Sequence, residues 1–207
     1  NYIRSKNELE FKQQALRIIK EAEKECSWMY KTIHYIDKKP TKTKGNINYI
    51  VWSDVFTCPY CNEKYVYWDL AIDFGKQQEL KKYQCPFCNS IITKRDSKRS
   101  FKKVVDYDLR KTHNQYETVP VLINYTWQDK KYKKKPDKKD LELINEINRI
   151  PIPYWYPNEE FRKGDKTNEF IRLGIPSINQ LYTKRNLYFL AKINNIIEKQ
   201  GKKYLKT

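Results

Sequence analysis

Two stretches of this sequence match each other: Cys58-Pro59-Tyr60-Cys61 and Cys85-Pro86-Phe87-Cys88, each followed by an asparagine and separated by 23 residues. Two thiolates that lie two residues apart can bind one metal ion from a tight turn, and two such turns complete a tetrahedral shell of four sulfurs. The pattern therefore predicts a zinc ribbon with one structural zinc site. Its predicted ligands are Cys58, Cys61, Cys85 and Cys88.

Two other roles for these cysteines compete with zinc binding. A redox pair needs one C-x-x-C motif on a βαβ background, whereas this sequence has two matched motifs. Disulfides are typical of secreted proteins, and we find no signal peptide. The fifth cysteine, Cys26, has no partner nearby in the sequence, so we predict a small buried hydrophobic residue. A closed four-sulfur site stabilises a fold and does not activate water.

The residues around the two motifs predict an α+β fold with a strand-rich centre. Aromatic and β-branched residues are concentrated in residues 46–56, 65–72, 101–107 and 116–127, which predicts strands there. Residues 128–130 predict a hairpin turn into one more short strand. The strand over residues 65–72 is expected to fill the long connection between the two motifs.

Helices are expected on both sides of this centre. Asn7 and Glu10 predict a capped start for a helix over residues 8–27, and Asp137 and Thr183 predict the caps of two later helices. Prolines in residues 150–157 predict an extended aromatic connector between the later two. The expected buried faces carry Phe11, Ala15, Ile18, Ala22 and Met29, then Leu141, Ile144 and Ile147, then Leu187, Leu190, Ile193 and Ile197.

These elements divide the chain into three segments. Residues 1–45 form an N-terminal helical segment, and residues 46–135 form the zinc-ribbon and basic β region. Residues 136–207 contain a helix, the proline-aromatic connector and the C-terminal helix.

The chain of 207 residues is strongly basic, with 42 Lys and Arg against 25 Asp and Glu and a formal charge of +17. Residues 76–139 alone carry 18 basic against 7 acidic residues. This concentration predicts a nucleic-acid partner, although lysine runs are also common on solvated faces and in compositionally biased genomes. The clusters are Lys94, Arg95, Lys98, Arg99, Lys102 and Lys103, and then Lys130, Lys131, Lys133, Lys134 and Lys135; Tyr125, Trp127 and Tyr132 are candidates for stacking on bases.

Other classes of protein are disfavoured. The content of aromatic residues, 14%, argues against disorder, and no apolar run approaches the roughly 20 residues of a membrane-spanning helix. The five glycines are too far apart for a dinucleotide or P-loop site. Asp69 and Asp73 are too far apart along a strand for an acid–base pair. His34 and His113 are expected at the surface; Trp52, Trp68 and Trp155 are expected in the core.

Several segments together resemble the zinc-containing insert of bacterial site-specific DNA methyltransferases that modify adenine N6 or cytosine N4. These segments follow one another in matching order over most of residues 27–190: 27–32, 48–58, 67–69, 85–95, 119–125, 152–157 and 182–187. One departure is that relatives carry a histidine-rich stretch where residues 174–181 of this chain have none.

The resemblance implies a target-recognition region whose catalytic parts lie elsewhere. In that family a glycine loop for S-adenosylmethionine precedes the insert and a D-P-P-[YF] loop follows it, and neither is found in this sequence. Because Asn1 comes first and Met29 is the only methionine, we expect a fragment of a longer, cytoplasmic methyltransferase polypeptide. S-adenosylmethionine would then bind only to the full-length enzyme.

The expected function is recognition of double-stranded DNA, with no catalysis by this chain alone and no membrane partner. The residues expected to contact DNA are Lys94, Arg95, Lys98, Arg99, Lys130, Lys131, Lys133, Lys134, Lys135, Lys184 and Arg185. Two alternatives remain open: a structural or protein-interaction insert, and an RNA-binding zinc ribbon, which would prefer single strands and aromatic stacking.

Overall fold

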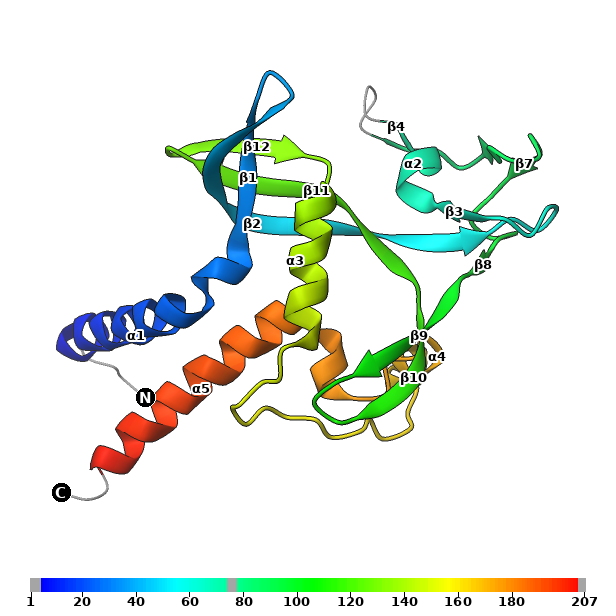
Figure 1. The fold of residues 1–207 in the computed structure, drawn as a ribbon. Helices are drawn as coiled ribbons and strands as arrows, with labels where there is room; N and C mark the ends of the chain where they lie inside the picture. Colours follow the sequence, from blue (N-terminus) through cyan, green and yellow to red (C-terminus); the bar gives the residue numbers. More distant parts are fainter. Residues whose placement is uncertain (1–4, 74–77, 205–207) are drawn as a thin grey trace.

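The computed structural model describes residues 5–73 and 78–204 and confirms a mixed helix and sheet fold with a strand-rich centre. A helix near each end of the described chain, α1 (Ser5–Cys26) and α5 (Lys184–Tyr204), flanks this centre (Figure 1). The other helices are η1 (Ser27–Tyr30), α2 (Tyr67–Ala71), α3 (Lys138–Arg149), α4 (Thr167–Arg172) and η2 (Ile178–Leu181). The strands are β1 (Lys31–Ile36), β2 (Lys39–Thr57), β3 (Lys64–Val66), β4 (Ile72–Asp73), β5 (Gln78–Glu79), β6 (Tyr83–Gln84), β7 (Ile91–Ile92), β8 (Lys98–Arg99), β9 (Phe101–Asp106), β10 (Lys111–Tyr116), β11 (Thr118–Trp127) and β12 (Lys130–Lys134).

The main sheet has the order β1-β2-β11-β12, with every neighbouring pair antiparallel. Strand β2 extends past this sheet, and its last residues pair with β3 and β8 at the cysteine-rich end of the molecule (Figure 1). It also runs without interruption across the segment boundary that we predicted between residues 45 and 46. One strand therefore joins the sheet to the cysteine motifs.

Two tight turns set the register of the sheet. Residues Asp37 and Lys38 join β1 to β2, and Gln128 and Asp129 join β11 to β12. All four have positive φ angles, between 46° and 64°, as two-residue hairpin turns of the I′ type require. The hairpin turn predicted at residues 128–130 is thus confirmed.

A glycine is required where the sheet packs most closely. Gly45 lies on the inner face of β2, and a Cβ atom placed there would lie 2.5 Å from Cδ2 of Tyr125. The ring of Tyr125 is almost fully buried and belongs to a core cluster with Ile47 and Ile123. Any larger residue at position 45 would displace this ring.

The prediction that His34 lies at the surface is wrong. Its side chain is 1% exposed, because β1 places it on the inner face of the sheet. The imidazole stacks on Trp127 with ring centroids 4.0 Å apart, and its Nδ1 lies 3.0 Å from the hydroxyl of Tyr125. Strand β1 had not been predicted, so nothing in the local pattern indicated an inner face.

A second core lies between the helices. It joins the end of α1, the start of α5, α3 and the connector, and it consists of Cys26, Met29, Ile147, Ile152, Leu187, Tyr188 and Ala191. Cys26 is fully buried, which confirms its predicted role. Beside it, the carboxylate of Glu25 accepts hydrogen bonds from the hydroxyls of Tyr154 and Tyr188 and pairs with Lys192.

Helix α3 begins as predicted. Its N-cap Asp137 accepts a hydrogen bond from the backbone N–H of Asp140, and Asp140 accepts one in return from the N–H of Asp137. This reciprocal capping box uses an aspartate at the third helical position. Asp140 is buried and also accepts a hydrogen bond from Thr32 on β1, so the helix start is attached to the sheet.

Other local predictions are corrected by the structure. Residues 67–71 form α2 and not a strand, so Asp69 and Asp73 do not share a strand face. Position 7 lies inside α1 and therefore does not cap it. Trp155 is 64% exposed, Trp52 lies at the surface at 36%, and Trp68 is half-buried. The predicted apolar faces are also partly exposed, at Phe11, Leu141, Leu190 and Ile197.

Among the helices of the described residues, none is both long and apolar enough to cross a membrane.

Candidate metal centre

The two cysteine motifs form two turns with the same backbone. In the first, the N–H of Asn62 donates to the carbonyl of Cys58 at 3.0 Å; in the second, the N–H of Asn89 donates to Cys85 at the same distance. Asn62 and Asn89 have φ angles of 62° and 60°. Asparagine is one of the few residues that adopt this left-handed conformation readily, which explains its presence after both motifs.

The two turns face each other and bring their thiols together. The four sulfurs of Cys58, Cys61, Cys85 and Cys88 all lie within 4.8 Å of one another. The closest pairs are Cys58 with Cys88 at 3.8 Å and Cys61 with Cys85 at 3.7 Å. A tetrahedron with metal–sulfur bonds of about 2.3 Å has edges of about 3.8 Å, whereas a disulfide bond measures about 2.05 Å. The cluster therefore fits a metal ion and contains no disulfide.

The thiols differ in acidity. Hydrogen bonds from the Ser90 hydroxyl and backbone lower the pKa of Cys88 to about 6. For Cys61, a backbone hydrogen bond from Glu63 lowers the pKa, but burial and the neighbouring thiols outweigh it and raise the pKa to about 12. Four thiols this close do not ionise together without a cation, because each thiolate repels the next. A bound divalent metal ion removes this repulsion.

A small hydrophobic cluster packs against the sulfur site. It contains Phe56, Tyr65, Ala71, Tyr83 and Ile92, together with the two buried cysteines. The hydroxyl of Tyr65 donates to Ser97 at 2.7 Å and lies 3.1 Å from the hydroxyl of Tyr83. Helix α2 contributes Ala71 to this cluster, so this part of the connection between the motifs packs against the two buried cysteines.

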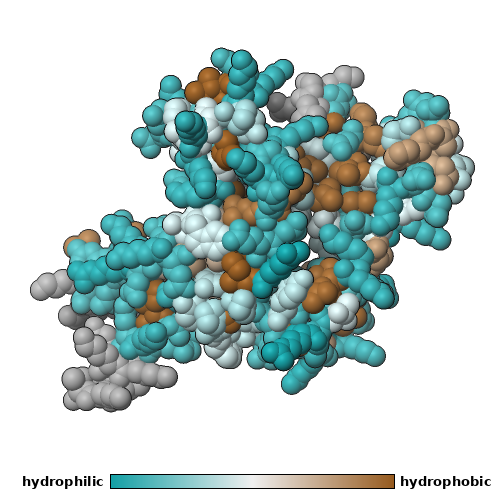
Figure 2. Space-filling model, viewed as in Figure 1, coloured by the Kyte–Doolittle hydropathy of each residue, from teal (hydrophilic) through white to brown (hydrophobic). Residues whose placement is uncertain are grey.

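The tips of the two turns are exposed and apolar. Tyr60, Phe87 and Ile91 are 69%, 57% and 68% exposed. Figure 2 shows that hydrophobic side chains gather near the end of the molecule that carries β3 to β8, whereas the rest of this face is mostly hydrophilic. Among the described residues 58–73 and 78–99, these three are the large apolar side chains with the greatest exposure.

The structure separates the predicted basic residues into two places. One group is exposed on and just after β12, level with residues 46–50 of β2: Lys130, Lys131, Lys133 and Lys135. The other group is exposed near residue 57, where β2 ends: Lys94, Arg95, Lys98 and Arg99. About ten residues of β2, roughly 33 Å of strand, separate the two groups. Lys94 lies over the ring of Tyr67, and Arg99 pairs with Asp54 at 3.2 Å.

Three of the predicted DNA contacts lie in the interior. The ammonium of Lys134, whose side chain is 9% exposed, lies 2.7 Å from Asp137 and 2.8 Å from Asp140. Burial lowers its pKa, but the hydrogen bonds to both aspartates outweigh this and leave the pKa raised. Lys184 pairs with Asp108. All of these charges are engaged within the fold.

Arg185 is the third interior cation. It is 8% exposed, and its guanidinium lies over the ring of Tyr30, 5.6 Å from the centroid. Burial lowers its pKa, which the nearby Tyr30 and Asp140 partly offset.

The aromatic residues proposed to stack on bases are packed against one another. Tyr125 is 1% exposed and stacks on Tyr132 with ring centroids 5.6 Å apart; Tyr132 and Trp127 pack around His34. Side chains alternate between the two faces of β12, so lysines and rings of one run point in opposite directions. Lys131, Lys133 and Lys135 face solvent, whereas Tyr132 and Lys134 face inward. These rings form part of the core and are not available for stacking on bases.

A comparison with protein-family models, with curated proteins and with solved structures finds no match to this chain.

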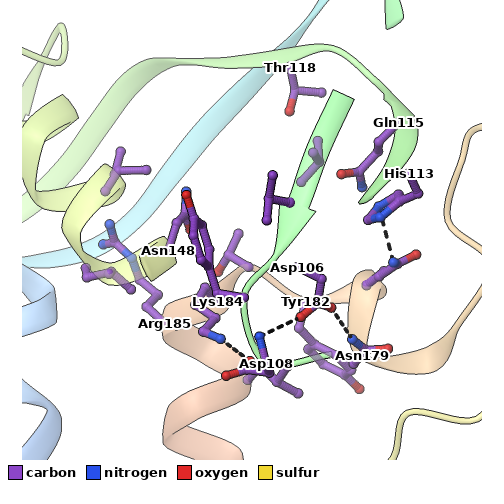
Figure 3. A pocket seen from close by; sticks show the side chains of 18 of the residues that line it. Asp106, Asp108, His113, Gln115, Thr118, Asn148, Asn179, Tyr182, Lys184 and Arg185 are labelled. Carbon is purple, nitrogen blue, oxygen red and sulfur yellow. Dashed lines mark hydrogen bonds and ion pairs between the residues drawn. The ribbon is translucent and has the colours of Figure 1, made fainter. Parts of the chain in front are cut away.

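Sequence reasoning missed one further feature, an open groove of about 720 Å³. The hairpin of β9 and β10 forms one side, and α3, η2 and the start of α5 form the other. Figure 3 shows Gln115 and His113 on the hairpin side and Asn148 and Arg185 on the other, with Asp108 at one end. Three stretches distant in the sequence, the hairpin, α3 and the segment from η2 to α5, form this groove, so no local pattern indicated it.

Proposed function

We propose that this chain is the DNA-binding, target-recognition part of an S-adenosylmethionine-dependent, site-specific DNA methyltransferase, with a structural zinc ion held by the four cysteines. The catalytic loops and the S-adenosylmethionine site belong to other parts of the enzyme in this proposal. The role of this chain is to hold a DNA duplex and to position its target base. A four-thiolate site is typical of structural zinc, because it leaves no coordination position for water or substrate.

The observation that carries the proposal is the solvent-facing side of the main sheet. Lys131 and Lys133 lie on β12 directly opposite Thr126 and Asn124 of β11. Asn48 of β2 donates to the side chains of both Asn124, at 2.8 Å, and Thr126, at 3.0 Å. Asn124 is 6% exposed, and its hydrogen bond to Asn48 holds β11 against β2. The exposed lysines beside this group suit a phosphate backbone, because lysines neutralise phosphates.

A second function is favoured by a different observation. Leu9, Phe11 and Leu16 on the first half of α1 are 62%, 70% and 48% exposed. Exposed apolar residues on one helix are typical of a protein-interaction surface. In this alternative the ribbon shapes a larger enzyme, and the lysines only keep the surface solvated.

The two functions differ in their dependence on salt. We expect the chain to bind a 20-base-pair duplex with an affinity that falls steeply as salt rises, since each phosphate contact adds about 0.9 to the log–log slope. Replacing Lys131, Lys133 and Lys135 by glutamine is expected to weaken binding and to reduce the slope by about 2 to 3. Fluorescence anisotropy at four or five salt concentrations measures both quantities.

Lys134 is left unchanged in this variant because it is buried between two aspartates. The matched control replaces three exposed lysines of α1, Lys12, Lys20 and Lys24, by glutamine, which removes the same charge from another place. Equal slopes for the two variants would favour the protein-interaction alternative. A clear preference for single-stranded RNA over the duplex would favour an RNA-binding ribbon.

A further inference from the structure

The groove between the β9–β10 hairpin and the helices has the size of a ligand site. Its volume of about 720 Å³ falls in the range of about 300–1,000 Å³ that is usual for small-molecule and cofactor pockets. Such a groove is too small to enclose a DNA duplex. It has room for a short stretch of unpaired nucleotides.

The charges of the groove favour an anion. Lys102 and Lys103 of β9 and Arg149 at the end of α3 line it, are exposed, and form no ion pair with any other described residue. The two carboxylates of the lining are already engaged. Asp106 accepts hydrogen bonds from the backbone N–H groups of residues 108 and 109, and Asp108 pairs with Lys184. The lining holds more cations than carboxylates, because Lys102, Lys103, Arg149, Lys184 and Arg185 outnumber these two aspartates, so its net charge is positive.

The uncharged lining suits nucleobases. Asn145 and Asn148 are exposed on α3, and Gln115 projects from β10. Amide side chains both donate and accept, as base edges require. Tyr107 and Tyr182, 48% and 46% exposed, supply flat faces for stacking. An amide-rich lining with exposed rings and cations at its edge is the combination that single-stranded nucleic acids require.

Two polar atoms of the lining also lack partners. Within the described part of the chain, three buried side-chain polar atoms form no hydrogen bond: Gln180 Oε1, Arg185 Nη1 and Asn195 Oδ1. The first two belong to residues that line the groove. Gln180 is also in contact with His113 through its amide nitrogen, at 3.2 Å from the ring Nε2. Buried polar groups are rarely left unpaired, so this lining has hydrogen-bonding capacity to spare for a polar ligand.

We infer that this groove binds a short unpaired segment of DNA, with its bases against Tyr107, Tyr182 and the amides and its phosphates at Lys102, Lys103 and Arg149. The inference rests on the proposed DNA-binding function and adds a second, distinct site to it. The lysines of β12 hold the duplex, and the groove receives nucleotides that have left the stack. Unstacking a nucleotide costs a few kcal/mol, which a preformed groove of this kind offsets.

A tetradeoxynucleotide of mixed sequence with one 5-bromodeoxyuridine tests this assignment. We expect saturable binding by fluorescence anisotropy and, after irradiation, cross-links at Tyr107 or Tyr182, located by mass spectrometry. Tyr182→Ala is expected to weaken tetranucleotide binding about tenfold, because one stacking platform is lost. Asn148→Ala, at an exposed position that does not support the fold, is expected to weaken it by about threefold. Tyr60→Ala, at an exposed tyrosine on the first cysteine turn outside the groove, is the control.

The outcomes separate this inference from the proposed function. A chain that binds the duplex with a steep salt dependence but does not bind the tetranucleotide, or cross-links to it outside the groove, overturns the inference alone. Unchanged tetranucleotide affinity in both Tyr182→Ala and Asn148→Ala also overturns it. Failure to bind either duplex or tetranucleotide overturns both.

Discussion

We define the knuckle region as residues 58–99 and the body as the rest of the molecule. The described strands of the knuckle region are two or three residues long, whereas β2 and β11 of the body extend over 19 and 10 residues. The body has two hydrophobic cores, one under the sheet and one among the helices. The hydrophobic cluster that the described residues of the knuckle region form with Phe56 includes two of the four clustered cysteines. Short isolated strand pairs are marginal in water.

This difference shows how the two regions are stabilised. The body is held by two hydrophobic cores and by long paired strands. The knuckle region has short strands and four clustered sulfurs that could hold a metal ion, so we expect its stability to depend on that ion. The four predictions below test this contrast, from the largest expected effect to the smallest.

Cys85→Ser is expected to have the largest effect. Structural zinc contributes on the order of 10 kcal/mol to the folding of small modules, so losing one ligand should unfold the knuckle region. Amide hydrogen exchange should increase in residues 58–99 and stay slow in β2, β11 and α5. Elemental analysis should find one zinc per wild-type chain and much less in the variant.

Cys26→Ser is the matched control, because Cys26 is buried in the body and is not a ligand. It is expected to keep one zinc per chain. Reduced wild-type protein without metal, or a metal content that Cys85→Ser leaves unchanged, would contradict the zinc assignment.

Lys134→Gln is expected to destabilise the body. The substitution leaves Asp140, which is 5% exposed, without its cation, and breaking a buried ion pair in this way costs about 3–5 kcal/mol. Chemical denaturation should show this loss, while zinc content stays the same. The neighbouring Lys133→Gln, on the exposed side of β12, should change the free energy of unfolding by about 0.5 kcal/mol or less. Similar losses in both variants would show that Lys134 is not buried as described.

Acid should separate the two regions. In the body, burial raises the pKa of Glu25 and of Asp137, but hydrogen bonds from Lys192, Lys134 and nearby tyrosines lower each pKa by more. These carboxylates therefore stabilise the fold fully above their unfolded pKa values of about 4, and the stabilisation is lost as pH falls through the lower folded values.

Zinc binding, in contrast, requires thiolates. Protons therefore compete with zinc for the cysteines at a higher pH than the one at which these carboxylates become protonated. We expect zinc release, followed with a coloured chelator, to precede loss of the body's near-ultraviolet circular dichroism as pH falls. Simultaneous loss of both signals would mean that the regions unfold as one unit.

Glu117→Gln is expected to have the smallest effect. Glu117 lies at the junction of the regions, where it accepts hydrogen bonds from Lys64 at 2.9 Å and from the hydroxyl of Ser100 at 2.8 Å. Lys64 is more than half exposed, and such pairs contribute about 1 kcal/mol or less. The loss should appear as slightly faster hydrogen exchange in β3 and β8 alone. A larger and global loss would indicate that the junction couples the two regions tightly.

Patterns within short stretches of sequence determined the metal-binding turns and most of the long elements. Each cysteine motif contains its own ligands, and the asparagine after it forms the turn, so the sulfur cluster needed only two such turns to meet. The strands near residues 46–56, 101–107 and 116–127 followed from their aromatic and β-branched composition, and the start of α3 at Asp137 followed from capping. Both signals act between near neighbours.

Only the tertiary structure decided which side chains of these elements are buried. Lys133 and Lys134 are neighbours in one lysine run, yet the pleat of β12 places Lys133 in solvent and Lys134 between two aspartates at the start of α3. His34 became a core residue because β1 pairs with β2, and the groove exists because β10, α3, η2 and α5 meet. Contacts between distant residues depend on strand register and helix packing, and a single sequence carries no local signal of either.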